Sequence, residues 1–458
     1  MYTNQQYQTA RMSRDPRFDG VFFIAVKTTG VYCRPICPAN APKEDNVEYF
    51  QSAIEASKCG YRPCLRCRPD SAPQSNPWLG TETTVNRAIS ILLSENEPTS
   101  MVSLAERLGI SDRYLRKLFN EKVGVTPLQF QIYHNLLLAK KLLHQTQMPI
   151  SDIAFACGFN SIRQFNASFK QHFRFPPSQI RKAQNKEQDV ISVSLAFRPP
   201  YNWQILSEFL RKRAIDNVEV VTVDSYSRTV TIDNESHGWF CATFNEEQNT
   251  FDLDIKVSDL KMLKPMIANI SRCLDLNANL HIIEPHLVRA GIPEERLIKG
   301  LRVPGIWSSF EAGIRAILGQ QVSVKAARTL VQKLVDALGE DNVCNSESVN
   351  FPTPKAIASS DLAFLPMPQR RKETLINFAN YMRDSANEKG DLGHWLSLKG
   401  IGPWTVDYAK FRGENHPDIW LDGDLGIKKA NNLFKGKLAP DNASPWRSYL
   451  TFQLWQHL

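Results

Sequence analysis

Four cysteines in two close pairs form the clearest chemical motif in the sequence. Cys33 and Cys37 are separated by three residues, and Cys64 and Cys67 by two. Pairs at this spacing supply two thiolate ligands from one turn, and zinc takes four such ligands in a tetrahedral site. Four cysteines without a metal are disfavoured, because so short a segment has little core of its own. The sequence therefore predicts a Zn²⁺ site, with Cys59 left as a buried or spare thiol.

A second group of candidate residues lies near the C-terminus. Gly400 and Gly402 stand between two amphipathic stretches, and Pro403 suits the first turn of the following helix. A tight glycine hairpin at a helix start exposes N–H groups that bind phosphate, although helix ends use glycine routinely. Asp424 follows 22 residues after Gly402, and each carboxylate in this region is by default a surface residue. The competing carboxylates are Asp407, Asp418 and Asp422.

The elements that position these residues must belong to several domains. A chain of 458 residues predicts two to four of them, and 42% hydrophobic with 22% charged residues excludes a disordered polymer. No apolar run approaches the ~18 residues that cross a bilayer, and the first residues lack the apolar core of a secretory signal. We therefore expect a soluble, cytoplasmic protein. The segments Asp70–Gly80 and Ala183–Asp189 are predicted linkers.

The first half of the chain contains a basic internal repeat. Leu104 to Ser111 is matched 49 residues later by Ile153 to Asn160, and each copy predicts a short helix, a turn, and a longer helix that starts at Ser111 or Asn160. Residues 1–80 carry 10 basic against 7 acidic side chains and residues 81–185 carry 13 against 7, whereas the remainder is close to neutral. A helical bundle would also need glycine turns. Two helix-turn-helix copies on a basic segment nevertheless favour DNA binding.

The second half changes from strands to helices. Four segments between Ile191 and Ser258 alternate or are rich in β-branched and aromatic residues, which predicts a small antiparallel sheet. From about Glu284 to the C-terminus, short amphipathic segments separated by Gly and Pro predict helices. The expected fold class is multidomain α+β.

The second copy of the repeat resembles a known family of regulators. GFNSIRQFNASFKQHFRFPPSQIRK is similar to the AraC-type transcription regulators, which carry two helix-turn-helix motifs and contact successive major grooves. Arg174 stands where that family usually has Gly, so the turn after the helix is expected to differ. The resemblance implies DNA contacts by Arg113, Arg116, Arg163 and Gln164.

The cysteine segment resembles another family. AVKTTGVYCRPICPANAPKEDNVEYF followed by GYRPCLRCRPD is similar to the N-terminal domain of the Ada methylphosphotriester acceptors, across about residues 8–70. The resemblance implies that Cys33 takes a methyl group from a DNA phosphotriester and that Arg62 and Arg66 contact phosphate. Asn40 stands where that family can carry a basic residue. The family's other acceptor motif, Pro-Cys-His-Arg, is absent from the sequence.

The C-terminal half resembles the helix-hairpin-helix DNA glycosylases of the AlkA type, from about residue 195 to 458. FEAGIRAILGQQVSV, GIGPWTVDYAKFRG and PWRSYLTFQLW match in order. The resemblance implies that Asp424 is catalytic and that Trp404, Tyr408 and Trp455 form a pocket for cationic bases, although three core aromatics would otherwise be expected. Gln321 occupies the position of the residue that wedges into the duplex. Strand-cleaving relatives carry lysine at the position of Trp404, so no lyase activity is expected.

Together these features predict a bacterial, nucleoid-associated protein that senses and repairs DNA alkylation, with double-stranded DNA and RNA polymerase as partners and no membrane. A pure regulator with a non-catalytic glycosylase half is one alternative. A zinc-stabilised repair enzyme with non-specific helix-turn-helix copies is another. The predicted domains are a zinc-binding methyl-acceptor domain at 1–72, a helix-turn-helix domain at 81–183, a β subdomain at 190–285 and a glycosylase domain at 286–458.

Overall fold

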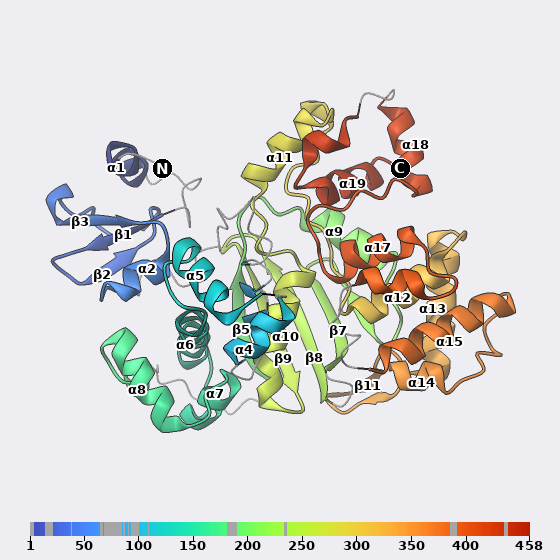
Figure 1. Ribbon diagram of the computed structural model, residues 1–458, viewed down its shortest axis with the longest axis horizontal. Coiled ribbons are helices and arrows are strands. Elements are labelled where there is room, and N and C mark those ends of the chain that lie inside the picture. Colours follow the sequence, from blue (N-terminus) through green and yellow to red (C-terminus); the bar gives the residue numbers. More distant parts are fainter. Residues whose placement is uncertain are drawn as a thin grey trace. The chain divides into compact units, whose positions relative to one another are not determined.

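The computed structural model forms two compact units, residues 1–196 with 259–268 (unit 1) and residues 197–258 with 269–458 (unit 2), whose elements are labelled in Figure 1. Both predicted linkers lie outside the residues that the structure describes. Those residues are 4–13, 22–37, 39–64, 67, 85, 88–89, 91–92, 100–108, 110–180, 190–232, 236–384, 392–434 and 438–458.

A four-stranded sheet begins unit 1, in the order β3-β1-β2-β4. β1 pairs antiparallel with β2 and β3, and β4 pairs parallel with β2. Apolar residues cover both faces, so that Phe22 packs with Tyr7 of α1 and Phe23 packs with Ala56 of α2. The elements are α1 (Asn4–Ser13), β1 (Phe23–Val26), β2 (Val31–Cys33), β3 (Val47–Phe50), α2 (Ala53–Lys58) and β4 (Arg62–Pro63).

Two helix-turn-helix copies follow, α4 with α5 and α7 with α8, and α6 connects them. The Ser111 hydroxyl accepts the Tyr114 N–H at 3.3 Å, which confirms the predicted start of the first long helix. The prediction of Asn160 was wrong by one residue, because the extended Ser161 places its hydroxyl 3.2 Å from the Gln164 N–H. The helices are α4 (Met101–Arg107), α5 (Asp112–Lys122), α6 (Pro127–Gln145), α7 (Ile150–Ala156) and α8 (Ile162–Phe173).

The predicted antiparallel sheet is confirmed. β6, β7, β8 and β9 pair in sequence order, each antiparallel to the next. Alternate residues such as Tyr226, Phe240 and Leu253 are buried, as expected of a sheet with one covered face. The strands are β5 (Ile191–Ala196), β6 (Glu219–Val221), β7 (Ser225–Ile232), β8 (Ser236–Asn245) and β9 (Thr250–Val257).

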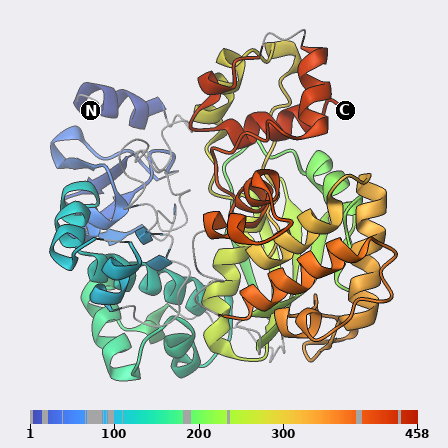
Figure 2. The same ribbon diagram turned by 45° about the vertical axis from the view of Figure 1, so that its right-hand side comes forward.

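The helices of unit 2 surround two apolar cores. One core lies among α12, α13, α15 and α17, and the other among α9, α11, α17 and α19. α11 therefore lies beside α19 despite the distance along the chain (Figure 1, Figure 2). The helices of unit 2 are α9 (Trp203–Arg211), α11 (Leu280–Arg289), α12 (Ser309–Gly319), α13 (Val324–Leu338), α14 (Pro354–Ala358), α15 (Gln369–Met382), α17 (Pro403–Gly413), α18 (Leu425–Leu433) and α19 (Arg447–Trp455), and the boundary between the units falls within α10 (Leu263–Cys273).

One element of this half departs from the predicted all-helical texture. β10 (Asp341–Asn342) and β11 (Asn345–Val349) form a small hairpin after α13. The Asn342 side chain holds the hairpin, since its carbonyl oxygen accepts the N–H groups of Cys344 and Asn345. Within the described residues, no helix has the length and apolar character needed to span a bilayer.

Candidate functional site

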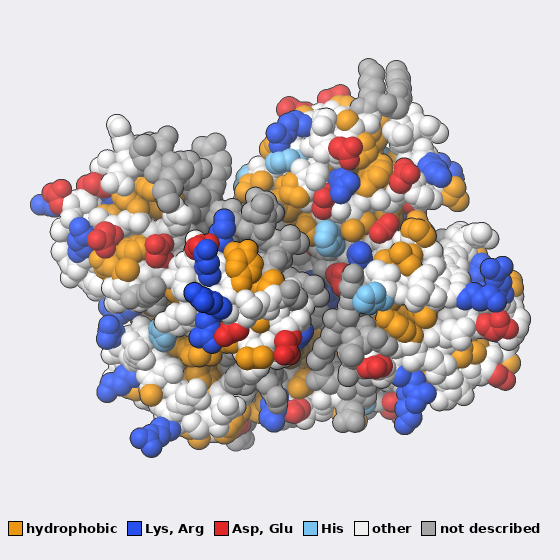
Figure 3. Space-filling model, viewed as in Figure 1, with side chains coloured by type: hydrophobic (Ala, Val, Ile, Leu, Met, Phe, Trp, Pro, Cys, Tyr) orange, Lys and Arg blue, Asp and Glu red, His pale blue; other side chains and the backbone are white. Residues whose placement is uncertain are grey.

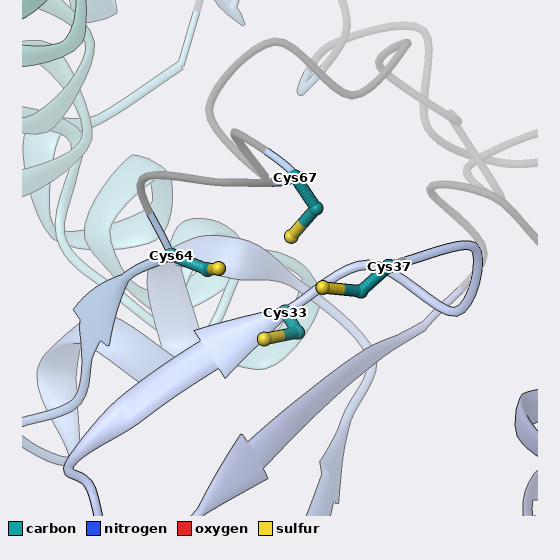
Figure 4. A group of neighbouring side chains, drawn as sticks. All are labelled: Cys33, Cys37, Cys64 and Cys67. Carbon is teal, nitrogen blue, oxygen red and sulfur yellow. The ribbon is translucent and has the colours of Figure 1, made fainter. Parts of the chain in front are cut away.

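The sulfur atoms of the four paired cysteines point toward one another (Figure 4) and all lie within 4.8 Å of one another. β2 ends at Cys33, and Cys64 follows the last residue of β4, so the parallel β2–β4 pair brings the two halves of the motif together. A tetrahedral zinc site with Zn–S bonds near 2.3 Å needs sulfur atoms about 3.8 Å apart. The cluster therefore fits Zn²⁺.

Electrostatics explains why such a cluster needs a cation. Close contacts with Cys37 and Cys67, together with burial, raise the pKa of Cys33, whereas contacts with Cys33 and Cys67 lower the pKa of Cys37 to about 2. Four adjacent thiolates repel one another unless a metal neutralises them. Cys64 and Cys67 are buried, while Cys33 and Cys37 remain partly exposed, and the exposed Cys59 stands apart at the end of α2.

Sequence reasoning missed Arg34, the residue after Cys33. Its backbone N–H donates to the Cys67 sulfur at 3.4 Å, and its guanidinium donates to the Cys67 carbonyl at 3.3 Å. The neighbour of the predicted acceptor thus links both halves of the cluster. Arg62 is partly exposed on β4, Asn40 is exposed, and Arg66 lies outside the described residues.

The cysteine cluster is connected to the helices of unit 1 through the residue before Cys33. The Tyr32 hydroxyl lies 2.6 Å from that of Tyr133 on α6, and both rings are buried. This hydrogen bond joins residues 101 positions apart. It fixes the strand that ends in Cys33 against the helix that connects the two helix-turn-helix copies.

The predicted DNA contacts lie on the exposed faces of α5 and α8. Arg113, Arg163 and Gln164 are exposed, as is Arg116, which forms an ion pair with Asp112 one turn earlier. Lys and Arg side chains gather over α5 (Figure 3).

Arg174 ends α8 in the left-handed conformation, with φ +67°. The expected change of this turn is therefore not seen, and an arginine adopts the backbone conformation that glycine usually provides.

Asp424 is the N-cap of α18. Its Oδ1 accepts the backbone N–H of Ile427 at 3.1 Å and the indole N–H of Trp455, also at 3.1 Å. Trp455 lies on α19, so two helices orient this partly exposed carboxylate. The structure thus brings together two of the predicted site residues by a direct hydrogen bond.

The competing carboxylates have different surroundings. Asp418 forms a bidentate ion pair with Arg447 at 2.7 and 2.9 Å, and although burial opposes the effect, these hydrogen bonds lower the pKa of Asp418. Asp422 is exposed, and burial raises the pKa of Asp407 on α17. Among these four described carboxylates, it is Asp424 that accepts a hydrogen bond from a predicted pocket residue.

Two of the three predicted pocket aromatics, Trp455 and Trp404, lie beside the Asp424 segment, and the third, Tyr408, stacks on Trp404. Trp404 and Tyr408 stack on one face of α17, with ring centroids 5.3 Å apart. A side chain added at Gly423 would lie 3.9 Å from the Trp404 indole, which places that ring beside the segment that precedes Asp424. All three rings are partly exposed rather than fully buried, as a binding surface requires.

α9 contributes residues that sequence reasoning missed. Phe209 lies nearly parallel to Trp455, with centroids 6.4 Å apart, and the Arg213 guanidinium lies 3.7 Å from the Phe209 ring centroid. Burial and the nearby Arg412 lower the pKa of Arg213 to about 10. Phe209 has the apolar spacing of any amphipathic helix, so no local pattern could have assigned it to this site.

The glycine hairpin precedes α17 as predicted. Gly400 has φ +91°, and a side chain there would collide with Thr374, so glycine is required. Gly402, the N-cap of α17, borders open space. Gln321 is exposed with φ +59° in the turn between α12 and α13.

Three family models match the chain. They are the metal binding domain of Ada at residues 6–70, a helix-turn-helix domain at 104–183, and the AlkA N-terminal domain at 192–308. They follow one another along the chain in the order of the structural elements described above.

Curated relatives match the same parts. DNA-3-methyladenine glycosylase 2 of Escherichia coli is 32% identical over 57% of this chain and 96% of its own length. The bifunctional transcriptional activator/DNA repair enzyme Ada of that organism is 36% identical over 28% of this chain and 35% of its own.

One relative covers nearly the whole chain. The probable bifunctional transcriptional activator/DNA repair enzyme AlkA of Mycobacterium tuberculosis is 31% identical over 98% of this chain and 95% of its own length. With the zinc-type cysteine cluster, the paired helix-turn-helix copies and the Asp424–Trp455 hydrogen bond all present, the chain belongs to this family of bifunctional transcriptional activators and DNA repair enzymes.

Proposed function

We propose that this protein both activates transcription in response to DNA alkylation and excises alkylated bases such as 3-methyladenine. The observation that carries the repair half is the Asp424 carboxylate, which the Trp455 indole N–H holds at 3.1 Å beside the stacked Trp404 and Tyr408. Decay to a purely regulatory protein would have no reason to keep this arrangement.

Excision follows from the charge of the damaged base. Alkylation at a ring nitrogen makes a purine cationic, and a cation is attracted to aromatic faces such as those of Trp404, Tyr408 and Trp455. The base is already a good leaving group, so the enzyme must extrude it and stabilise the oxocarbenium-like sugar, which the Asp424 carboxylate does electrostatically. The C1′–N bond breaks, its electron pair neutralises the base, and water oxygen bonds to C1′.

The glycosylase is proposed to act by hydrolysis alone. Strand cleavage by this class of enzyme proceeds through a Schiff base, which needs a lysine amine at the sugar. Trp404 stands at the position where strand-cleaving relatives carry that lysine. We expect the product to be an intact strand with an abasic site.

In unit 1, we propose that the Cys33 sulfur attacks the methyl carbon of a DNA methylphosphotriester. A C–S bond forms, the C–O bond breaks, and the phosphodiester regains its negative charge. Zinc held by Cys33, Cys37, Cys64 and Cys67 keeps the sulfur deprotonated and nucleophilic. Methylation removes one negative charge near the DNA surface, which strengthens binding to the promoter.

The exposed faces of α5 and α8 would then bind promoter DNA. The side chains that would make these contacts are Arg113, Arg116, Arg163 and Gln164, and Arg62 and Arg66 would contact phosphates.

In unit 2, Gly400 and Gly402 would hold phosphate on the damaged duplex, and Gln321 would fill the gap left by the flipped base. Activation of transcription further implies contact with RNA polymerase on bacterial nucleoid DNA.

Incubation with methylated duplex DNA tests both activities in one tube, with free base measured by chromatography and protein mass by peptide mapping. We expect 3-methyladenine release, one methyl on Cys33, and no borohydride-trapped complex. Asp424→Asn should abolish release, while Asp422→Asn, two residues upstream and exposed, should not. Normal release by Asp424→Asn would show that another group is catalytic. Absence of release by the parent protein would leave the purely regulatory alternative, and a methyl on Cys59 would contradict the acceptor assignment.

A further inference from the structure

Two consecutive glutamines occupy the turn between α12 and α13, and their surroundings differ. Gln321 is exposed, with its backbone in the left-handed region. Gln320 is partly buried, and its amide nitrogen donates to the Gly400 carbonyl at 3.3 Å and to the Thr405 hydroxyl oxygen at 3.2 Å. No role was predicted for Gln320 from the sequence.

One acceptor of Gln320 belongs to the glycine hairpin, and the other belongs to the helix that follows it. Gly400 is the left-handed residue of the hairpin, and Thr405 is in the first turn of α17, with only 1% of its surface exposed. The Thr405 N–H in turn donates to the Gly402 carbonyl at 3.0 Å. A single side-chain amide therefore connects the turn that carries Gln321 to the hairpin and to the helix that follows it, across 80 and 85 residues of sequence.

We propose that Gln320 is a positioning residue that holds the wedge turn in register with the phosphate-binding hairpin. This inference rests on the proposed roles of Gln321 and of the hairpin. Once the hairpin binds backbone phosphate, the position of Gln321 relative to the base stack is set by the Gln320 amide. Base extrusion and backbone binding then act as one rigid device.

A left-handed, exposed residue such as Gln321 is inherently strained, and it keeps its conformation only when its surroundings impose it. Toward the hairpin, the Gln320 amide supplies two hydrogen bonds. Loss of two ordinary hydrogen bonds corresponds to a change of roughly tenfold or more in the population of the correctly placed turn.

The test uses the full-length protein and a duplex that contains ethenoadenine, an alkylated base whose fluorescence reports unstacking. Gln320→Ala should slow both unstacking and single-turnover base release by roughly tenfold. The loss should shrink to about twofold on a duplex with a one-nucleotide gap opposite the lesion, where extrusion is easier. A merely structural role would reduce both substrates equally.

Three further variants identify the hydrogen bonds as the cause. Gln320→Glu keeps the size but turns an acceptor toward the Gly400 carbonyl, so it should lose that bond and slow unstacking as Gln320→Ala does, even if the Thr405 hydroxyl donates to the new carboxylate. Thr405→Val should give a partial loss that is not additive with Gln320→Ala. Gln332→Ala is the matched control. It removes a similar side-chain amide, that of Gln332 on α13, which donates to the Asp216 carbonyl at 3.3 Å rather than to the hairpin.

The outcomes separate the proposed role of Gln320, which we call the tether, from the proposed role of Gln321 as the wedge. If Gln321→Ala slows unstacking but Gln320→Ala and Gln320→Glu do not, the tether is overturned and the wedge stands. If Gln321→Ala leaves unstacking unchanged, the wedge assignment is wrong and the inference about Gln320 is lost with it. Equal loss on intact and gapped duplexes would also overturn the tether.

Discussion

At the scale of single residues, the proposed role of Asp424 makes its hydrogen bond with Trp455 the contact on which base excision should most depend. Trp455→Phe keeps an aromatic ring in the pocket but removes the N–H that orients the carboxylate. A hydrogen bond to a charged group contributes about 1.5–3 kcal/mol, so we expect single-turnover base release to fall at least tenfold. Binding of lesion DNA, measured by fluorescence anisotropy, should change much less.

Trp446 offers the control for this substitution. Its indole N–H is buried and, within the described part of the chain, has no hydrogen-bond partner. Trp446→Phe should therefore leave base release unchanged, and any loss of stability should come from the smaller ring in the apolar core rather than from the N–H. If both variants lose activity alike, the effect belongs to packing rather than to orientation of Asp424.

Asp275 predicts a pH dependence of stability in unit 2. Burial raises its pKa to about 6, even though Arg302 and hydrogen bonds from Val303 and Tyr449 favour the charged form. Because the folded pKa exceeds the unfolded value of 3.8, this group stabilises the fold below about pH 4, and that contribution is lost as the pH rises through 6. The loss is on the order of 3 kcal/mol.

Asp275→Asn does not titrate, so its unfolding free energy relative to that of the parent protein should rise by this amount between pH 4 and pH 7. Urea unfolding followed by tryptophan fluorescence measures it, since eight of the nine tryptophans lie in unit 2. A difference that stays constant over this pH range would contradict the assignment.

At the scale of elements, the Tyr32–Tyr133 hydrogen bond should couple β2 to α6. Tyr32→Phe and Tyr133→Phe each remove this bond, and the double variant removes nothing further. A double-mutant cycle on the unfolding of unit 1, followed by calorimetry with zinc bound, should give a coupling free energy of about 1 kcal/mol. Additive effects of the two substitutions would show that the hydroxyls act independently.

Much at this scale could be predicted from sequence because it depends on local spacing. The cysteine pairs, the Ser111 cap, the glycine hairpin and the alternating strands are each encoded within a dozen residues. Gly400 could be placed because its neighbours define a hairpin, whereas Asp424 was distinguished from the other carboxylates by the resemblance to the AlkA-type glycosylases.

Contacts between distant segments could not be predicted in this way. A buried ion-pair network joins the sheet to α12, the helix that leads to Gln320. Its members are Glu219 of β6, Arg228 of β7, and Glu311 and Arg315 of α12. Burial opposes the charge, but Arg315 and Arg228 lower the pKa of Glu219 to about 2. Each of these residues has the sequence context of an ordinary surface charge. The contact between Phe209 and Trp455 could not be predicted for the same reason.

At the scale of the whole molecule, the two reactive groups belong to different compact units, Cys33 to unit 1 and Asp424 to unit 2. We expect Asp424→Asn to accept a methyl on Cys33 at the normal rate. Protein already methylated on Cys33 should release 3-methyladenine as fast as fresh protein. Mass spectrometry and base release, measured on the same samples, check both statements. A base-release rate that changes with methylation would show that the units are coupled.

The separation of the two groups gives the chain two ways of recording damage. The cysteine sulfur is consumed once per molecule, so the methylated fraction keeps a memory of the accumulated dose. The carboxylate of Asp424 is regenerated in every cycle, so it responds only to the lesions present at that moment. Under the proposed roles of Cys33 and Asp424, a cell that carries this protein therefore holds one dose-recording methyl acceptor and one base-excising catalyst on every copy of the chain.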